Sequence, residues 1–284
     1  AVKFDNLGKL HVLDTGTGTI FRVEGGENVS VAELSPGLDN FVIDEDGRFF
    51  VTSFTDGFVK RVNKDKSVTQ LQPGGMAHAG GIALFKETLV VADLHAIRGY
   101  ETTGAEAFVQ RNVLGTGTMG GALNVSADGE DLVLTSWVDN DVRVWNQKDQ
   151  VVKWRKVGLA APVSAIRYGE LIVVAEHGQQ RVVGFNKAGD LAVVYAENLP
   201  APTGLLVDGG DLYVTDRTRG QILKIADGGE PLKVAEVVVG GLVSPEGILR
   251  FKGSFVVIEA DPGFVTLIDE QDKRAVLAKV PPGS

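Results

Sequence analysis

Residues 201–225 read APTGLLVDGGDLYVTDRTRGQILKI and contain three strand patterns separated by two turns. The apolar run at residues 204–207 precedes Asp-Gly-Gly-Asp, and a glycine pair supplies the positive φ angles of a tight hairpin. Residues 212–215 have the β-branched and aromatic content of a second strand. Residues 221–225 alternate polar and apolar side chains, as a strand with one solvated face does. With residues 231–239 as a fourth strand, this stretch predicts a four-stranded antiparallel meander.

The same pattern occurs seven times along the 284 residues. The second strands of the copies begin 39 to 43 residues apart, at Leu10, Phe49, Leu89, Leu132, Leu171, Leu212 and Phe255. A single meander cannot bury both of its faces, so each copy needs neighbours like itself. Four-stranded units at this period are typical of β-propeller blades. The sequence therefore predicts an all-β fold, a seven-bladed β-propeller of four-stranded antiparallel blades, in a single domain over residues 1–284.

Composition limits the classes of partner. The net charge is −9, which argues against nucleic acid and anionic membranes and favours a cation, a basic protein or a neutral small molecule. The absence of cysteine excludes disulfides, thiolate metal sites and a cysteine nucleophile. No apolar run reaches the roughly 18 residues of a membrane span. The first copy begins inside its strand and without Met, so we expect a longer polypeptide that extends upstream, and we favour an exported protein.

Blade geometry gathers the distinctive side chains on one rim. In a meander, the turns after second strands and the loops leading into first strands share a rim, which we call the upper rim. The turns after first strands occupy the other, lower rim and have ordinary turn residues. The upper rim is expected to carry our candidate ligand-binding residues, which are His78, Asp39, Asn40, Trp137 and Arg217. Trp137 is singled out because a flat ligand could stack on its ring.

The residues that end the second strands have two interpretations. We interpret the short ones as turn caps that accept backbone N–H bonds, namely Asp14, Ser53, Asp93, Ser136 and Asp216. Glu176 and Glu259 break this pattern, because glutamate is a poorer local cap, and this favours a functional role. Glu176 and His177 are the candidate catalytic residues, with a plain surface-turn histidine as the alternative for His177. We assign structural roles to His11 and His95.

Three carboxylates form a candidate metal site, which consists of Glu246, Glu259 and Asp39. Glu246 leads into a first strand and Glu259 ends the neighbouring strand of the same copy, so the two carboxylates would repel each other unless a cation or a shared proton lay between them. Oxygen ligands of this kind suit Ca²⁺ or Mg²⁺. The alternative is that Glu246 forms an ion pair with Arg217. An acidic upper rim would favour cationic partners, whether small molecules or proteins.

The repeat pattern, G-I/L-x-V-D-x-x-G-x-L-x-V-x-D, resembles NHL-type propellers and their relatives, the gluconolactonase/regucalcin-like hydrolases and the streptogramin B lyases. The resemblance to gluconolactonase-like enzymes implies one divalent metal held by a Glu-Gly motif, which Glu246-Gly247 matches, together with Asn and Asp residues that this chain does not fully supply. The resemblance to streptogramin B lyases implies seven blades, magnesium and a Pro-His pair, where this chain has Pro245-Glu246. Neither activity transfers residue by residue.

Two functions from different classes follow from these observations. The first is a non-catalytic module that binds a ligand or a protein on its upper rim. The second is a divalent-metal-dependent lactonase, hydrolase or lyase that uses the same rim. Convergence of three or more carboxylate, Asn or His side chains would favour the enzyme.

Overall fold

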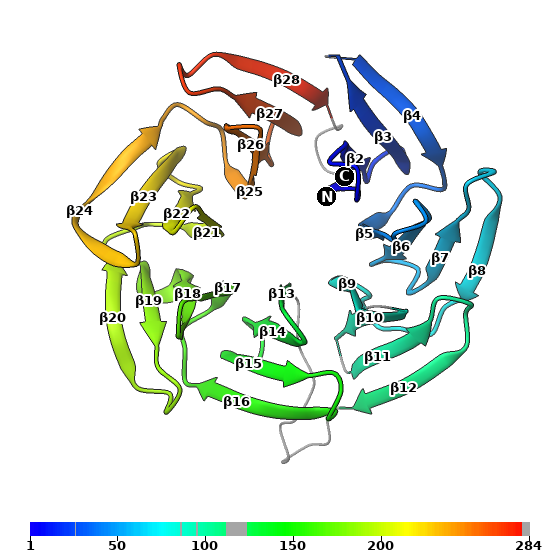
Figure 1. The fold of residues 1–284 in the computed structure, drawn as a ribbon, viewed down its shortest axis with the longest axis horizontal. Coiled ribbons are helices and arrows are strands. Elements are labelled where there is room, and N and C mark those ends of the chain that lie inside the picture. Colours follow the sequence, from blue (N-terminus) through cyan, green and yellow to red (C-terminus); the bar gives the residue numbers. More distant parts are fainter. Residues whose placement is uncertain (26, 86, 95, 112–123, 280–284) are drawn as a thin grey trace. The chain divides into compact units, whose positions relative to one another are not determined.

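The computed structural model describes residues 1–25, 27–85, 87–94, 96–111 and 124–279. In these residues the chain forms 28 β-strands and one short 3-10 helix, η1 (His177–Gln179). The strands make seven four-stranded antiparallel sheets, and within each sheet every strand pairs with its neighbour in sequence, as Figure 1 shows. The predicted all-β, seven-bladed β-propeller fold is confirmed. No helix in the described ranges is both long enough and apolar enough to cross a membrane.

The blades follow one another in sequence order. Blade one consists of β1 (Val2–Phe4), β2 (Leu10–Asp14), β3 (Thr19–Glu24) and β4 (Glu27–Glu33). Blade two consists of β5 (Leu38–Ile43), β6 (Phe49–Ser53), β7 (Val59–Val62) and β8 (Val68–Gln72). Blade three consists of β9 (Ile82–Phe85), β10 (Thr88–Asp93), β11 (Ala96–Glu101) and β12 (Glu106–Arg111). Blades four and five consist of β13 (Asn124–Asp128), β14 (Asp131–Ser136), β15 (Asp141–Asn146), β16 (Val151–Val157); and β17 (Pro162–Tyr168), β18 (Leu171–Glu176), β19 (Arg181–Phe185), β20 (Leu191–Ala196). Blades six and seven consist of β21 (Pro202–Asp208), β22 (Asp211–Asp216), β23 (Gln221–Asp227), β24 (Glu230–Val239); and β25 (Pro245–Phe251), β26 (Ser254–Glu259), β27 (Phe264–Ile268), β28 (Arg274–Lys279).

Contacts divide the chain into two compact units, Ala1–Val125 and Ser126–Pro282. The first unit holds blades one to three and the second holds blades four to seven, with the boundary inside β13. Within the second unit the first strands of successive blades, β17, β21 and β25, contact one another. The grouping of all seven blades in one domain stays a prediction.

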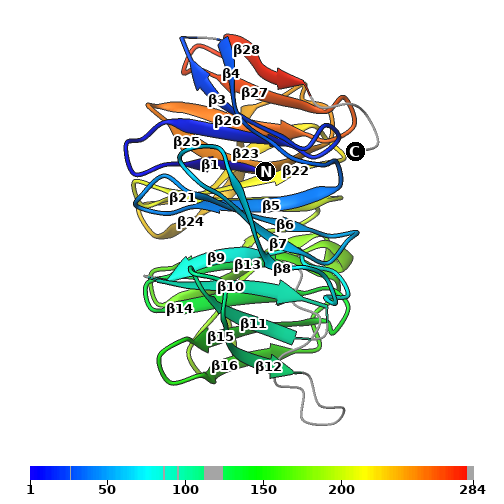
Figure 2. The same cartoon turned by 90° about the vertical axis from the view of Figure 1, so that its right-hand side faces the viewer.

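The core lies between successive blades. In the second unit, Val173 of blade five and Val214, Leu223 and Ile225 of blade six belong to one buried apolar cluster. Five of the six residues of β18 are buried, because a second strand is covered by neighbouring blades on both faces. This explains why the second strands read as near-continuous apolar runs. Figure 2 shows hairpin turns at both ends of the strands of a blade, and these ends form the two rims of each unit.

Candidate functional site

On the upper rim of the second unit, backbone hydrogen bonds join turns and loops of the same blade. In blades five, six and seven the turn after the second strand binds the loop that leads into the first strand of the same blade. Backbone N–H groups of the turn donate to loop carbonyls at 2.8–3.1 Å, from His177 to Ala161, from Arg217 to Ala201 and from Ala260 to Ser244. Turn and loop residues of a blade therefore lie together at one edge, and substitutions in either would alter the same surface.

The residues that end the second strands are buried and hydrogen-bonded to backbone. The predicted capping role of the short side chains is confirmed, since Asp14 accepts bonds from Gly16 and Thr17 of its own turn, and Asp216 does the same for Thr218 and Arg219. In four blades the side chain reaches the loop residue 16 positions earlier. These pairs are Ser53 with Gly37, Asp93 with Ala77, Glu176 with Ala160, and Glu259 with Val243.

The candidate catalytic pair lies at the end of β18. Glu176 is 2% exposed, and its Oε1 accepts a bond from the Ala160 backbone N–H at 2.7 Å. Its Oε2 accepts a bond from Arg181 Nε, also at 2.7 Å. His177 is exposed at the start of η1. Both oxygens of Glu176 are thus engaged by protein donors, and a catalytic role for Glu176 and His177 stays a prediction.

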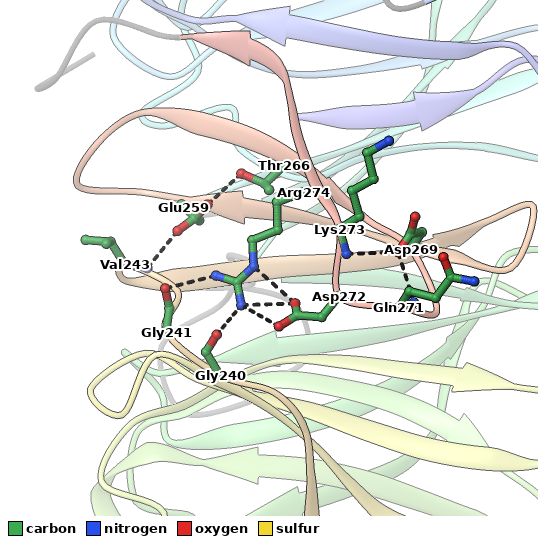
Figure 3. Close-up of polar contacts among 10 residues, drawn as sticks. All are labelled: Gly240, Gly241, Val243, Glu259, Thr266, Asp269, Gln271, Asp272, Lys273 and Arg274. Carbon is green, nitrogen blue, oxygen red and sulfur yellow. Dashed lines mark hydrogen bonds and ion pairs between the residues drawn. The ribbon is translucent and has the colours of Figure 1, made fainter.

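Glu259 has the same arrangement in blade seven, as Figure 3 shows. Its Oε2 accepts a bond from the Val243 backbone N–H at 2.7 Å, and its Oε1 accepts one from Thr266 Oγ1 at 2.5 Å. Below it in the same view, Arg274 donates to the carbonyls of Gly240 and Gly241 and so holds the preceding part of the loop. Glu259 is 7% exposed, and it joins the loop that leads into β25 to the third strand of its blade, β27.

Glu246 forms the ion pair that the sequence offered as an alternative to a metal. Its Oε1 lies 3.2 Å from Nη1 of Arg217, and Nη2 of the same guanidinium lies 3.4 Å from Oδ1 of Asp261. Ser244 donates a hydrogen bond to the other oxygen of Asp261. All three charged side chains are 43% exposed or more, so solvent screens these pairs strongly and each contributes little to stability. The exposed carboxylates Glu246 and Asp261 therefore share one arginine.

A buried threonine cluster, which the sequence analysis did not single out, fixes the backbone before Glu246. Thr215 Oγ1 accepts a bond from the Gly204 N–H at 2.7 Å and donates to the Glu246 carbonyl at 2.9 Å. Thr203 Oγ1 lies 2.8 Å from Thr215 Oγ1 and donates to the Pro245 carbonyl at 3.0 Å. A Cβ on Gly204 would lie 2.2 Å from the Glu246 carbonyl oxygen, so only glycine fits there. The signal was present as Thr-Gly in β21 opposite Thr215 in β22.

Hydrogen bonds and buried ion pairs hold the turn that carries Trp137. Ser136 accepts a bond from the Asp139 N–H at 2.9 Å, and Arg143, only 1% exposed, contacts the carboxylates of Asp139 and Asp141 at 2.8 Å. Burial raises the pKa of Asp141, against the opposing effect of the guanidinium groups of Arg143 and Arg155. Trp137 itself is 51% exposed. An exposed indole thus stands on a turn whose backbone is fixed.

Three candidate residues lie in the first unit. His78 stacks on Phe54, with ring centroids 4.2 Å apart and an interplanar angle of 12°. Asn40 accepts a bond from the N–H of Phe41 at 2.9 Å, and burial raises the pKa of the neighbouring Asp39. His95 lies outside the described residues. Asp39 belongs to a different unit from Glu246 and Glu259, and within the described ranges no three His, Cys, Asp or Glu side chains are grouped so that they could hold a metal ion.

Comparisons with known proteins agree with the fold. No known protein family matches the sequence, and no curated protein sequence matches it. Among solved structures, a streptogramin B lyase has a TM-score of 0.72 at 13% identity, covering 90% of this chain and 89% of its own. A catalytically inactive virginiamycin B lyase from Staphylococcus aureus, crystallised with quinupristin, has a TM-score of 0.72 at 13% identity, over 96% and 92% of the two chains. The computationally designed protein Ika8 has a TM-score of 0.65 at 14% identity, over 95% and 82%.

The chain is therefore a seven-bladed β-propeller whose fold is similar to that of the streptogramin B lyases. The predicted resemblance to these propellers is confirmed at the level of the fold. The designed protein is about as similar, so the likeness concerns architecture. The NHL-type and gluconolactonase-like relationships stay predictions.

Proposed function

We propose that this protein is a non-catalytic β-propeller that binds a partner protein through the upper rim of its second unit. The observation that carries the proposal is a contrast between two kinds of side chain on that rim. The carboxylates suited to chemistry, Glu176 and Glu259, are buried with both oxygens bonded to protein donors. The exposed side chains, led by Trp137, are of the kind that protein interfaces favour.

Trp137 is the anchor of the proposed interface. Tryptophan is enriched among the residues whose removal costs most binding free energy, and these residues are surrounded by contacts that exclude water. Its neighbour Val138 is 55% exposed, and Val243, in the loop before blade seven, is 51% exposed. Because Ser136 and the buried Arg143 fix the turn, little conformational entropy would be lost when a partner covers it.

Arg217 supplies the polar part of the same rim. Its guanidinium is 43% exposed and divides its bonds between Glu246 and Asp261, so a partner carboxylate could take over one of its N–H groups. Arginine is also enriched at interfaces. Three other carboxylates of this rim, Glu176, Asp216 and Glu259, are each at most 7% exposed and therefore contribute little to its surface charge.

The test compares partners captured by the native chain and by Trp137→Ala, with Val234→Ala as the matched control. Val234 is 81% exposed on β24, away from the rim turns, so its truncation removes apolar surface of another region. Each captured protein is purified and its affinity measured by calorimetry. A direct partner should bind Val234→Ala like the native chain and Trp137→Ala at least about 30-fold more weakly, which corresponds to about 2 kcal/mol. Equal affinity for all three proteins refutes the proposed interface.

The second candidate function is a divalent-metal-dependent lyase or hydrolase, which the fold similarity to streptogramin B lyases favours. It would use Glu246, Glu259 and Asp39 as ligands of Ca²⁺ or Mg²⁺ and Glu176 and His177 in catalysis. The described residues do not fit this role as they stand, because protein donors occupy both oxygens of Glu176 and Glu259. We derive no reaction step from them.

Metal binding separates the two candidate functions. The melting temperature of the native chain and of Glu246→Gln is measured with Ca²⁺, with Mg²⁺ and with a chelator. A metal site would stabilise the native chain by about 2.7 kcal/mol at a hundredfold excess over Kd, and the variant less. Stabilisation by metal would favour the enzyme and would contradict the proposal of a non-catalytic protein. Unchanged melting temperatures under all three conditions would rule out the metal-dependent enzyme as the function.

A further inference from the structure

A cavity of about 410 Å³ opens on the lower rim of the first unit, between blades one and two. Its walls come from the turn between β1 and β2, from the turn between β5 and β6, and from the turn between β7 and β8. All of these residues lie within the first unit. The cavity is therefore independent of the upper rim and of the function proposed for it.

The register of blade one places His11 inside this cavity. His11 pairs with Arg22 on β3, and Arg22 pairs with Val29 on β4, so the three side chains share one face of the blade. Phe49 of blade two meets this row, with its ring centroid 5.3 Å from that of His11 in an edge-on arrangement. His11 is 3% exposed and lines the cavity. The imidazole thus lies in the inner wall beside the apolar side chains of Val29 and Phe49.

Two hydrogen-bond acceptors face each other at this inner wall. The His11 Nδ1 lies 3.1 Å from the Lys9 carbonyl, which can only accept, so Nδ1 carries the proton in the neutral ring. The other ring nitrogen, Nε2, lies 4.0 Å from Oδ2 of Asp5. Asp5 uses its Oδ1 to accept bonds from the N–H groups of Leu7 and Lys9. Burial lowers the pKa of His11, which favours the neutral ring and leaves Nε2 as an acceptor beside a carboxylate.

The distance between these two acceptors is too long for a direct hydrogen bond, and neither has another hydrogen-bond donor among the described residues. A hydroxyl group has a single proton and can donate to only one of them, so two neighbouring hydroxyl groups, as in a sugar, are needed to donate one bond to each. A buried polar atom gains most from such a partner. The inner wall therefore has the chemistry to bind a hydroxyl-bearing ligand.

The mouth of the cavity is cationic, although the chain as a whole carries a net charge of −9. Four basic side chains line it, Lys9, Arg22, Lys64 and Lys66, against the two carboxylates of Asp5 and Asp46. Arg22 Nε is closely paired with Glu24 at 2.6 Å, whereas the lysines have only long ion pairs, 3.7 Å from Lys9 to Glu24 and 3.8 Å from Lys64 to Asp46. Several cations around one opening attract small anions.

We propose that this cavity binds a small hydroxylated anion, such as a phosphorylated or carboxylated sugar. Two neighbouring hydroxyl groups donate to His11 Nε2 and Asp5 Oδ2, and its anionic group lies among Lys9, Lys64 and Lys66. Val29, Ile43 and Phe49 supply the apolar wall against which the carbon skeleton packs. Both features are needed, since lysines alone would hold any anion and the inner wall alone any alcohol.

The experiment uses the full chain and three probes, glucose 6-phosphate, inorganic phosphate and glucose. Binding is followed by calorimetry and by the imidazole NMR signals of His11 in protein labelled with ¹⁵N-histidine. The variants are Lys64→Ala/Lys66→Ala and His11→Phe, and the control is Lys233→Ala, an exposed lysine of the second unit. The lysine variants change exposed turn residues and leave the core intact, so they remain informative if His11→Phe does not fold.

The proposal expects glucose 6-phosphate to shift the His11 Nε2 signal and to bind at least about tenfold more tightly than either phosphate or glucose. The double lysine variant should lose about tenfold in affinity for the phosphorylated sugar, and the control should lose nothing. His11→Phe should bind glucose 6-phosphate no better than phosphate. The proposal is overturned if no probe moves the His11 signal at millimolar concentration, if phosphate and the phosphorylated sugar bind equally to the native chain, or if the lysine variant binds like the control.

Discussion

Replacing Glu176 by glutamine separates a structural role of this carboxylate from a catalytic one. The native side chain accepts two short bonds, from the Ala160 N–H and from Arg181 Nε, each at 2.7 Å. Glutamine has nearly the same shape but only one acceptor oxygen, and its NH₂ group would meet one of the two donors. The substitution therefore changes hydrogen bonding while the volume of the buried site stays the same.

The expected loss of stability follows from the charge of the acceptor. A hydrogen bond to a charged group contributes about 1.5–3 kcal/mol, more than one between neutral groups. Arg181 is 29% exposed and can regain water, whereas the carboxylate is 2% exposed. We therefore expect Glu176→Gln to lower the free energy of unfolding by about 1.5–3 kcal/mol.

The assay is chemical denaturation followed by intrinsic fluorescence, with Glu197→Gln as the control. Glu197 is an exposed glutamate in the loop after β20, and its substitution should change stability by less than about 0.5 kcal/mol. If Glu176→Gln is as stable as the control, the carboxylate does not hold the loop, and its candidate catalytic role regains weight.

Three further predictions concern buried groups. Thr215→Val should cost about 2–3 kcal/mol in denaturation experiments, because the Gly204 N–H and the Glu246 carbonyl lose their partner, and a loss below about 0.5 kcal/mol would contradict this account. Gly204→Ala should cost about 1–3 kcal/mol or prevent folding, since its Cβ would lie 2.2 Å from a carbonyl oxygen, and a native melting curve would be inconsistent with that contact. Burial lowers the native pKa of His11, so the unfolded chain takes up the proton first as the pH falls through 6.5, and stability should decrease from pH 7 to pH 5. In His11→Phe that pH dependence should become shallower by at most about 1.4 kcal/mol per pH unit, and parallel profiles for the two proteins would rule out His11 as its source.

The repeat could be predicted from the sequence because each blade is local. Residues 201–225 contain their own turns, and the observed β21, β22 and β23 begin and end within a few residues of the expected strands. The hairpin glycines and the alternation of Gln221–Asp227 depend only on neighbouring residues. The same locality made the capping role of Asp14 and Asp216 predictable, since each binds its own turn.

The roles of the two glutamates could not be predicted in this way. Glu176 and Glu259 were expected to be functional because glutamate is too long for its own turn, but that length lets each reach a loop residue 16 positions earlier. The fold of the whole blade brings that loop next to the end of the second strand, and neighbouring residues in the sequence do not reveal it. In blade six the residue 16 positions before Asp216 is Pro200, which has no N–H, so this loop position cannot donate a backbone bond to the carboxylate.

The sequence did not predict a binding site on the lower rim, because this site also depends on tertiary structure. Its turns contain ordinary turn residues, and only the folded first unit gathers Lys9, Lys64 and Lys66 around one cavity. His11 was assigned a structural role, which its burial against Phe49 supports, but the position of its Nε2 beside Asp5 depends on the turn geometry of β1 and β2.

The constant distance of 16 residues between loop and second strand determines where a blade can change in length. The copies differ by up to four residues in period, yet the four pairs beginning with Ser53 and Gly37 keep the same separation. In blade six the additional length lies in the fourth strand, because β24 has ten residues and the other fourth strands have five to seven. Grafted peptides or reporter tags should consequently be accepted at the Gly228-Gly229 turn before β24, whereas a single inserted residue between Val243 and Glu259 would detach the carboxylate from its loop.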